Sequence, residues 1–199
     1  EETGLGLPGE VSGILHPVDR WDGLTVTRLP MGHAISATPL QVHMAMSVIA
    51  NGGILMEPSV VRRIFDESGN TLAQSDPEAR RRVLSTETAR EMTRMLVAVV
   101  SDQGTARRAR IDSFQVAGKT GTTQKIVGGR YSNEKHVASF TGFFPADQPR
   151  IVMTVVVDEP QNIRIGYGGL VAAPLFQEIG ESLVRYFGIE PLDGESALV

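Results

Sequence analysis

Residues 116–125 read VAGKTGTTQK and overlap the end of a short strand-like run, Phe114 to Gly118. After Gly118 the chain carries lysine and threonine side chains where a buried strand would need apolar ones. Such groups are tolerated at an exposed sheet edge rather than in a sheet interior. The stretch therefore predicts a strand that leaves the core and presents a cation and hydroxyl groups to a ligand.

A nucleotide phosphate is one candidate ligand, because Gly-Lys-Thr also ends the phosphate loop G-x-x-x-x-G-K-[ST]. That loop needs a glycine five positions before Gly118, and the residue there is Ser113. The intervening residues 114–117 have the character of a strand rather than of a loop. The pattern argues against a nucleotide site.

A carboxylate on an extended peptide fits the stretch better. Lys119 supplies a fixed positive charge. Thr120 and Thr122 alternate with Gly121, so on a strand their hydroxyls share one face and can donate to the carboxylate. Gly121 has no side chain and lets a peptide pair with the strand edge. The backbone N–H of Thr122 is a candidate donor to an oxyanion.

The residues around this stretch predict an antiparallel sheet covered by a helix. Strands are expected at 113–120, 137–144 and 150–158, and sequential strands with short links usually pair as neighbours. A helix over 170–187 should cover them. Its expected buried stripe comprises Ala172, Leu175, Phe176, Ile179, Leu183 and Phe187.

The first half of the chain predicts helices and one hairpin. A helix over 38–51 begins with Thr38, Pro39 and a capping box completed by Gln41, and it is apolar on nearly all sides. His43 within it is interpreted as a packed or capped histidine rather than a metal ligand. A hairpin is expected over 60–72, and an amphipathic helix should run from Ser85 or Thr86 to near Gly104. Together the elements predict an α+β fold.

Composition excludes several classes of function. The 199-residue chain has a net charge of -4 and a pI near 5.6, which argues against nucleic-acid binding. The arginines at 80–82 and at 107, 108 and 110 are interpreted as solvated surface. There is no cysteine, so disulfides and thiolate metal sites are excluded. The densest apolar run, Ile151 to Val157, is far shorter than the ~20 residues that span a bilayer.

Several blocks of the sequence carry a family resemblance. In chain order they read TGLGLPGE, GHAISATPLQVHMAMSVIANGG, VAGKTGTTQK, YSNEKHVASFTGFFP and YGGLVAAPLFQEI. Over residues 1–188 they resemble the transpeptidase domain of class B penicillin-binding proteins. The amino-acid sequence of the GHAISATPLQ block is most similar to division- or sporulation-type members. The resemblance implies a partial penicillin-binding-protein transpeptidase (serine β-lactamase-like) fold, an antiparallel sheet flanked by helices. Residues 1–199 would be the C-terminal portion of one domain. That portion comprises a helical part with a hairpin (1–112), the last three strands and C-terminal helix (113–188), and a tail (189–199).

The resemblance also implies a reaction and a set of site residues. The complete enzyme would be a serine D,D-transpeptidase that cross-links peptidoglycan stem peptides through an acyl-enzyme and is acylated by β-lactams. Lys119 and Thr122 would be catalytic, and Thr120, Gly121, Thr122 and Thr123 would bind substrate, without a metal or cofactor.

The family's motifs occur in a fixed order: Ser-x-x-Lys, then Ser-x-Asn, then Lys-Thr-Gly. Residues 132–135 read SNEK and residues 68–70 read SGN, but neither match has the right context. Ser132 follows Lys-Thr-Gly and is expected in a glycine-rich connection, whereas the chemistry needs serine and lysine one turn apart on a helix. Ser68 is expected in a hairpin turn. The nucleophilic serine is therefore predicted upstream of this chain.

The implied partners are the D-Ala-D-Ala stem peptide, β-lactams, an upstream segment of the same protein and membrane proteins of the division complex. The implied location is the extracytoplasmic (periplasmic) face of the cytoplasmic membrane, with an N-terminal anchor outside this chain. Two alternatives stay open: a non-catalytic scaffold or partner-binding module, and a β-lactamase-like hydrolase or β-lactam sensor. The long GHAISATPLQ block fits the second alternative poorly.

Overall fold

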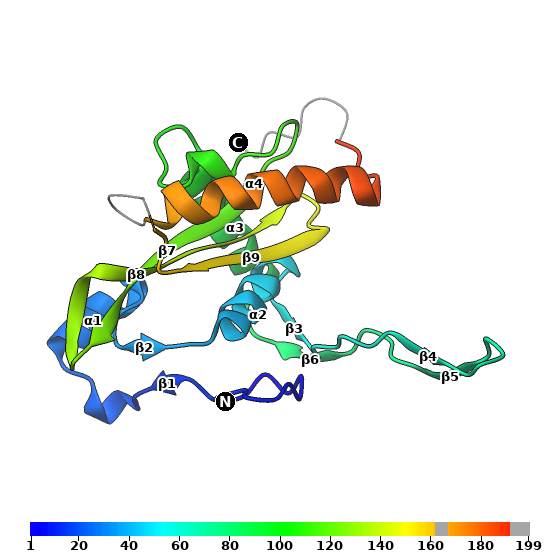
Figure 1. The fold of residues 1–199 in the computed structure, drawn as a ribbon, viewed down its shortest axis with the longest axis horizontal. Coiled ribbons are helices and arrows are strands. Elements are labelled where there is room, and N and C mark those ends of the chain that lie inside the picture. The colour runs from blue at the N-terminus through cyan, green and yellow to red at the C-terminus, as the bar shows by residue number, and fades with distance from the viewer. Residues whose placement is uncertain (162–166, 192–199) are drawn as a thin grey trace.

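The computed structural model describes residues 1–161 and 167–191 (Figure 1). The helices are α1 (Gly23–Arg28), α2 (Pro39–Ala50), α3 (Thr86–Val100) and α4 (Gly168–Phe187), with short 3₁₀ helices at Val18–Arg20, Leu29–Met31 and Arg107–Ala109. The strands are β1 (Ile14–Leu15), β2 (Ile35–Ser36), β3 (Ile54–Met56), β4 (Arg63–Phe65), β5 (Thr71–Gln74), β6 (Ala79–Arg82), β7 (Ala117–Val127), β8 (Arg130–Phe144) and β9 (Ile151–Asp158). None of the described helices is long and apolar enough to cross a membrane. The expected division at 112, 188 and 199 stays a prediction, and the end of its tail lies outside the described residues.

The central sheet has the predicted composition and direction. Its order is β7-β8-β9, and both pairs are antiparallel. However, β7 begins at Ala117, four residues after the expected start, and runs on to Val127, while β8 begins at Arg130. The expected bounds of 113–120 and 137–144 are therefore wrong for both strands: Ser113 has a left-handed backbone in a turn, and the two strands extend beyond Gly121. The sequence did not predict this extension, because the residues after Gly121 are mostly polar and show no apolar strand pattern. The two strands still pair there, since backbone hydrogen bonds between strands do not require apolar side chains.

Helices cover both faces of the sheet. On one face Phe176 of α4 packs edge-on against Phe140 and Phe144 of β8, with ring centroids 4.7 Å and 5.8 Å away. On the other face α2 and α3 contribute Met46 and Leu96. There they join a second apolar cluster completed by Ala117, Phe143 and Ala146. The fold is the predicted α+β arrangement of an antiparallel sheet flanked by helices (Figure 1).

The start of α2 is confirmed in detail. Thr38 Oγ1 accepts from the Gln41 N–H at 3.1 Å, and Gln41 Oε1 accepts from the Thr38 N–H at 2.8 Å. The predicted end of the next helix near Gly104 is wrong, since α3 ends at Val100 and Gly104 does not have a left-handed backbone. Gly104 instead lies against the carbonyl oxygens of Ala98 and Val99, where any side chain would collide.

The predicted hairpin is present as β4 and β5. Asp66 Oδ1 accepts from the backbone N–H groups of Ser68 and Asn70 at 2.9 Å and 2.8 Å, which closes the turn. Residues 68–70 therefore form a solvent-exposed turn, as the sequence context indicated. Figure 1 shows this hairpin projecting away from the rest of the molecule. The arginines of β6 are exposed, as predicted, and Arg80 pairs with Glu57.

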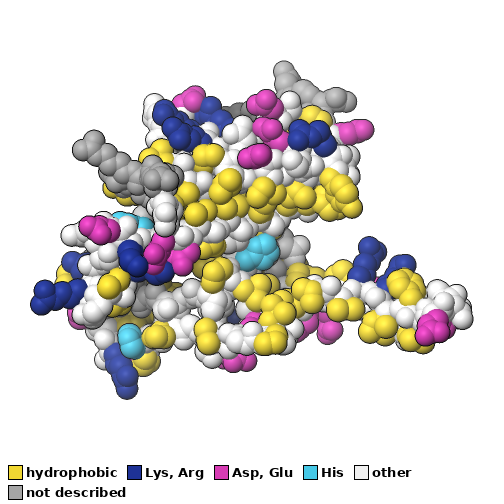
Figure 2. Space-filling view, viewed as in Figure 1, with side chains coloured by type: hydrophobic (Ala, Val, Ile, Leu, Met, Phe, Trp, Pro, Cys, Tyr) yellow, Lys and Arg dark blue, Asp and Glu magenta, His cyan; other side chains and the backbone are white. Residues whose placement is uncertain are grey.

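The expected buried stripe of α4 is only half correct. Phe176 is fully buried, but Leu175, Ile179 and Phe187 are 40%, 44% and 55% exposed. The apolar arc of α4 is wider than three strands can cover, because among the described residues no strand pairs with the outer edge of β9. In Figure 2 a row of hydrophobic side chains (yellow) crosses the molecule at the height where Figure 1 shows α4.

Candidate functional site

The Lys-Thr-Gly stretch lies on β7, the edge strand of the sheet. In register, Lys119 faces Thr141 of β8, and Thr141 faces Thr154 of β9. Cross-strand partners project on the same face, and His43 of α2 contacts Thr154, so Lys119 is on the face that carries α2. Thr123 shares this face by alternation and is exposed.

The hydroxyls of Thr120 and Thr122 lie on the opposite face. They share one face as predicted, and it is the face that α4 covers. Thr122 Oγ1 accepts a hydrogen bond of 3.1 Å from the backbone N–H of Gly168, the first residue of α4. Thr120 Oγ1 lies 3.2 Å from Thr105 Oγ1.

A ligand along the outer edge of β7 can therefore be reached from both faces. Lys119 is exposed and forms no ion pair with the described residues; its Nζ donates only to the Thr120 carbonyl at 2.9 Å. β8 occupies the inner edge of β7, and no described strand pairs with the outer edge. The arrangement offers a cation, two hydroxyls and an open strand edge to an extended anionic peptide. The direction of the Thr122 N–H stays a prediction.

Three residues beside this stretch were missed by sequence reasoning: Thr105, Gly168 and Gly169. The signal in the sequence was indirect. α4 begins after Tyr167, whose side chain provides no cap, although a helix start of this kind normally needs an acceptor for its free N–H groups. The sequence thus indicates that a local capping side chain is missing, but it does not indicate which group accepts from the helix start.

The SNEK match does not form a catalytic pair. Ser132 is on β8, not in a connection between strands as expected, and it lies in a bulge, because Gln124 faces His136 while Ile126 faces Tyr131. Ser132 Oγ accepts from the backbone N–H groups of Glu134 and Lys135. This local turn gives the serine a structural role.

Lys135 belongs to an ionic cluster at the far end of the sheet. Its Nζ lies 3.3 Å from Glu159, which also contacts Lys125 at 2.8 Å, and Lys125 contacts Asp158 at 3.0 Å. Hydrogen bonds from Lys125 and then Lys135 hold the pKa of the Glu159 carboxyl below its ordinary value. The cluster ties β7 and β8 to the end of β9.

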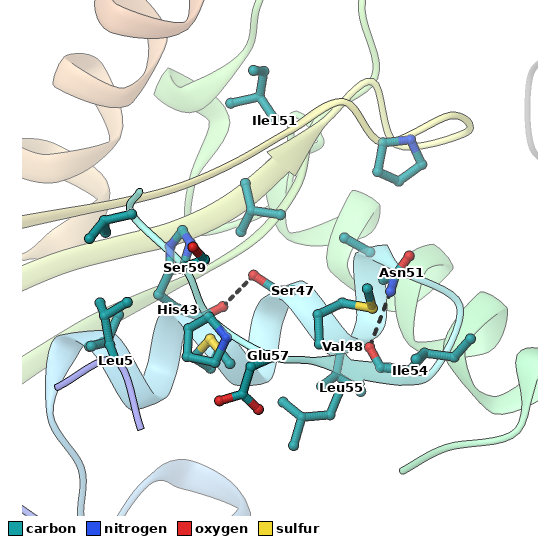
Figure 3. A pocket seen from close by; sticks show the side chains of 18 of the residues that line it. Leu5, His43, Ser47, Val48, Asn51, Ile54, Leu55, Glu57, Ser59 and Ile151 are labelled. Atoms are coloured by element: carbon teal, nitrogen blue, oxygen red, sulfur yellow. Dashed lines mark hydrogen bonds between the residues drawn. The ribbon is translucent and has the colours of Figure 1, made fainter. Parts of the chain in front are cut away.

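A cavity of about 390 Å³ lies away from the Lys-Thr-Gly stretch. It is formed by α2, β3 with the residues after it, and the start of β9 (Figure 3). Its lining is mostly apolar, with His43, Ser47 and Glu57 among the polar residues, and it contains none of residues 119–123. The cavity is therefore separate from the predicted site.

His43 is half-buried at the wall of this cavity, and its Nδ1 lies 3.1 Å from Thr154 Oγ1, as the packed interpretation expects. Burial lowers the pKa of His43 from its ordinary value of 6.5. As pH falls through 6.5 toward the lower folded-state value, the unfolded chain binds the proton first, so stability should fall in this window. His43→Gln should remove this part of the pH dependence. Thermal melts between pH 7.5 and 5 check it, and an equal loss of Tm in both proteins would contradict it.

Comparison with known proteins agrees with this fold. An antiparallel sheet between helices, with Lys-Thr-Gly on its open edge strand, is the arrangement that the sequence resemblance implied. The family described as "Penicillin binding protein transpeptidase domain" matches residues 1–181. The chain belongs to this family.

Individual relatives support the assignment. Penicillin-binding protein PbpB of Mycolicibacterium smegmatis is 38% identical over 193 residues, which are 93% of this chain and 30% of that protein. Stage V sporulation protein D of Bacillus subtilis is 37% identical over 192 residues, 96% of this chain and 29% of that protein. The chain thus spans less than a third of the length of either relative.

Solved structures agree with the fold. Penicillin-binding protein 3 from Mycobacterium tuberculosis, complexed with ampicillin, has a TM-score of 0.83 at 34% identity and covers 98% of this chain and 45% of its own. The apo transpeptidase domain of Burkholderia pseudomallei penicillin-binding protein 3 has a TM-score of 0.81, also at 34% identity, over 97% of this chain and 57% of its own.

Proposed function

We propose that this chain forms the Lys-Thr-Gly side of the active site of a serine D,D-transpeptidase that cross-links peptidoglycan. In the whole protein a serine Oγ would attack the penultimate D-Ala carbonyl of a stem peptide. The peptide C–N bond would break and terminal D-Ala would leave with a proton. The acyl group would then pass to an amine of a neighbouring stem. β-Lactams would acylate the same serine.

The observation that carries this proposal is the edge of β7. Lys119 has no acidic partner in the described part of the chain, and the hydroxyls of Thr120 and Thr122 lie beside the same open edge. A site that binds a carboxylate needs a positive charge and hydrogen-bond donors, and these residues provide both. Gly121 allows close approach because its position has no side chain; Ser139 Oγ lies directly against it on the inner side. Thr123 would contact the substrate farther along the edge.

The nucleophile would come from another part of the same protein. Every lysine of the chain lies on β7 or β8, namely Lys119, Lys125 and Lys135. A Ser-x-x-Lys pair needs its lysine on the same helix as the serine, one turn away. The relatives are much longer than this chain, which agrees with a catalytic serine outside it.

Location and further partners follow from the reaction class. Peptidoglycan is assembled in the cell envelope, so the site would face the extracytoplasmic (periplasmic) side of the cytoplasmic membrane, with an anchor outside this chain. The similarity to a sporulation protein supports a role in division-type wall synthesis, and membrane proteins of that machinery would then be partners.

Covalent labelling tests the proposed function. The full-length protein is incubated with a fluorescent penicillin, denatured and separated by electrophoresis. A fluorescent band that unlabelled penicillin suppresses supports the acyl-enzyme. A folded protein that gives no band would overturn the proposal in favour of a scaffold. Rapid release of hydrolysed penicillin, with only transient labelling, would favour the hydrolase alternative.

We also propose that an upstream segment covers the open side of the sheet. Leu175 and Ile179 of α4 and Val156 of β9 are all 40% or more exposed, and exposed apolar patches beyond a few hundred Å² are uncommon on stable monomers. Two further strands beside β9 and a helix against α2 would bury these surfaces and the cavity in Figure 3.

Expressed alone, residues 1–199 are therefore expected to self-associate, and co-expression with the upstream segment should give a one-to-one complex. Light scattering after size exclusion measures both states. Replacing Leu175 and Ile179 with Gln should reduce self-association, whereas the same change at Ile64 and Leu72 of the projecting hairpin serves as the control. A monodisperse 199-residue monomer that melts cooperatively would contradict the expectation.

A further inference from the structure

The start of α4 is bonded to the Lys-Thr-Gly strand. Gly168 is the first residue of α4, and its N–H has no carbonyl partner inside the helix. It donates instead to Thr122 Oγ1 at 3.1 Å, across 46 residues of sequence. Thr122 therefore does for α4 what a capping side chain usually does.

This hydrogen bond decides which role is left for the Thr122 hydroxyl. A hydroxyl has one proton to donate and two lone pairs to accept with. The Gly168 N–H occupies a lone pair, and Thr122 Oγ1 has no second partner among residues 1–161 and 167–191. The hydroxyl proton is therefore available. A carboxylate can only accept hydrogen bonds. Because the Gly168 N–H already donates to Thr122 Oγ1, the Thr122 hydroxyl is left free to donate its proton to a carboxylate.

The contact depends on glycine at two successive positions. A methyl group on Gly168 would overlap the Ser139 carbonyl oxygen and lie 2.5 Å from that of Gly121. A methyl group on Gly169 would overlap the Thr105 carbonyl oxygen. The same close approach holds the Thr105 hydroxyl 3.2 Å from the hydroxyl of Thr120. Thr120 and Thr122 thus each have a hydrogen-bond partner on the face of the sheet that α4 covers.

We infer that Gly168, Gly169 and Thr105 are positioning residues for recognition of the ligand carboxylate. The Gly168 N–H orients the Thr122 hydroxyl, Thr105 orients the Thr120 hydroxyl, and Gly169 keeps the helix start close enough for both. None of the three touches the ligand. This inference rests on the proposed function, since it concerns the same carboxylate.

The test compares a penicillin with its own ester in the full-length protein. Second-order acylation rates are measured for benzylpenicillin and benzylpenicillin methyl ester by competition with a fluorescent penicillin. Gly168→Ala should lower the rate for the acid by about threefold to tenfold, as expected for one weakened hydrogen bond to a charged group. The rate for the ester should change by less than about twofold, because the ester lacks the charged acceptor.

Gly180→Ala is the matched control. Gly180 is also on α4, and a methyl group there would collide with the Ile111 side chain in the core, far from Thr122. This variant should lower Tm and leave the acid-to-ester ratio unchanged. If Gly168→Ala lowers both rates equally, or changes neither, the positioning role is overturned.

Two further variants keep the inference falsifiable if Gly168→Ala does not fold. Thr105→Val should lower the acid-to-ester ratio about twofold to fivefold, and Thr105→Ser, which restores the hydroxyl, should recover it. Equal ratios in Thr105→Val and wild type would overturn the role of Thr105. In a Thr122→Val background, Gly168→Ala should have little further effect on the acid rate, because the hydroxyl that it orients is gone.

The wild-type protein separates this inference from the proposed function. If wild type is not acylated at all, the proposed function fails and the inference fails with it. If wild type is acylated and prefers the acid, but the Gly168 and Thr105 variants keep that preference, only the positioning role fails.

Discussion

Replacing Lys119 with alanine in the full-length protein is expected to lower the second-order rate of acylation by a fluorescent penicillin by at least about tenfold to a hundredfold. In the proposed site the ammonium would make a charge-assisted contact to the ligand carboxylate, worth about 1.5–3 kcal/mol, and would support the serine and lysine of the catalytic machinery. Lys119 is exposed at the edge of β7, so the free energy of unfolding should change by no more than about 1 kcal/mol.

Two other lysine variants make this prediction specific. Lys119→Arg should recover only part of the rate, because a planar guanidinium does not reproduce a compact point charge. Lys135→Ala should leave acylation nearly unchanged, since the Lys135 ammonium forms an exposed ion pair with Glu159 in the described part of the chain. Wild-type acylation in Lys119→Ala, or loss of acylation in Lys135→Ala, would mean that the wrong lysine has been assigned.

Phe176→Ala should produce the largest loss of stability, about 3–5 kcal/mol in the free energy of unfolding. Phe176 is fully buried and packs edge-on against both Phe140 and Phe144, so its removal leaves a cavity between α4 and the sheet. Urea denaturation of the full-length protein, followed by the transition of this domain, measures the change.

Tyr186→Ala on the same helix is the control for Phe176→Ala. Tyr186 is 82% exposed and touches Phe187 rather than the core, so its removal should change stability by less than about 0.5 kcal/mol. Similar losses in the two variants would show that α4 is not anchored through its phenylalanine contact with β8.

The elements that the sequence predicted well depend on short-range patterns. The capping box of Thr38 and Gln41 spans three residues, and both of its hydrogen bonds are present. The alternation of Lys119, Thr120, Gly121 and Thr122 follows from strand geometry alone, which is why the two hydroxyls share a face. Three sequential strands with short links also left few alternatives for the sheet.

Other features could not be predicted because they depend on packing between distant segments. The true ends of β7 and β8 lie in a polar ribbon, where no apolar pattern marks the strands. β3 pairs with β6, although the whole β4–β5 hairpin lies between them in the sequence. No local pattern in either short strand identifies the other as its partner. The exposure of Leu175 and Ile179 depends on how many strands lie beside α4, and the sequence of α4 gives no information about that number.

The sequence by itself thus determined the family, the α+β class and the residues of the Lys-Thr-Gly edge, because a motif and its strand alternation are local properties of the chain. Only the tertiary structure decided how those residues are held. Lys119 lies on the α2 face while Thr120 and Thr122 lie on the α4 face, and the start of α4 supplies the partner that orients Thr122. A hydrogen bond between Gly168 and Thr122 exists only when helix and sheet pack, so no pattern within either segment could have revealed it.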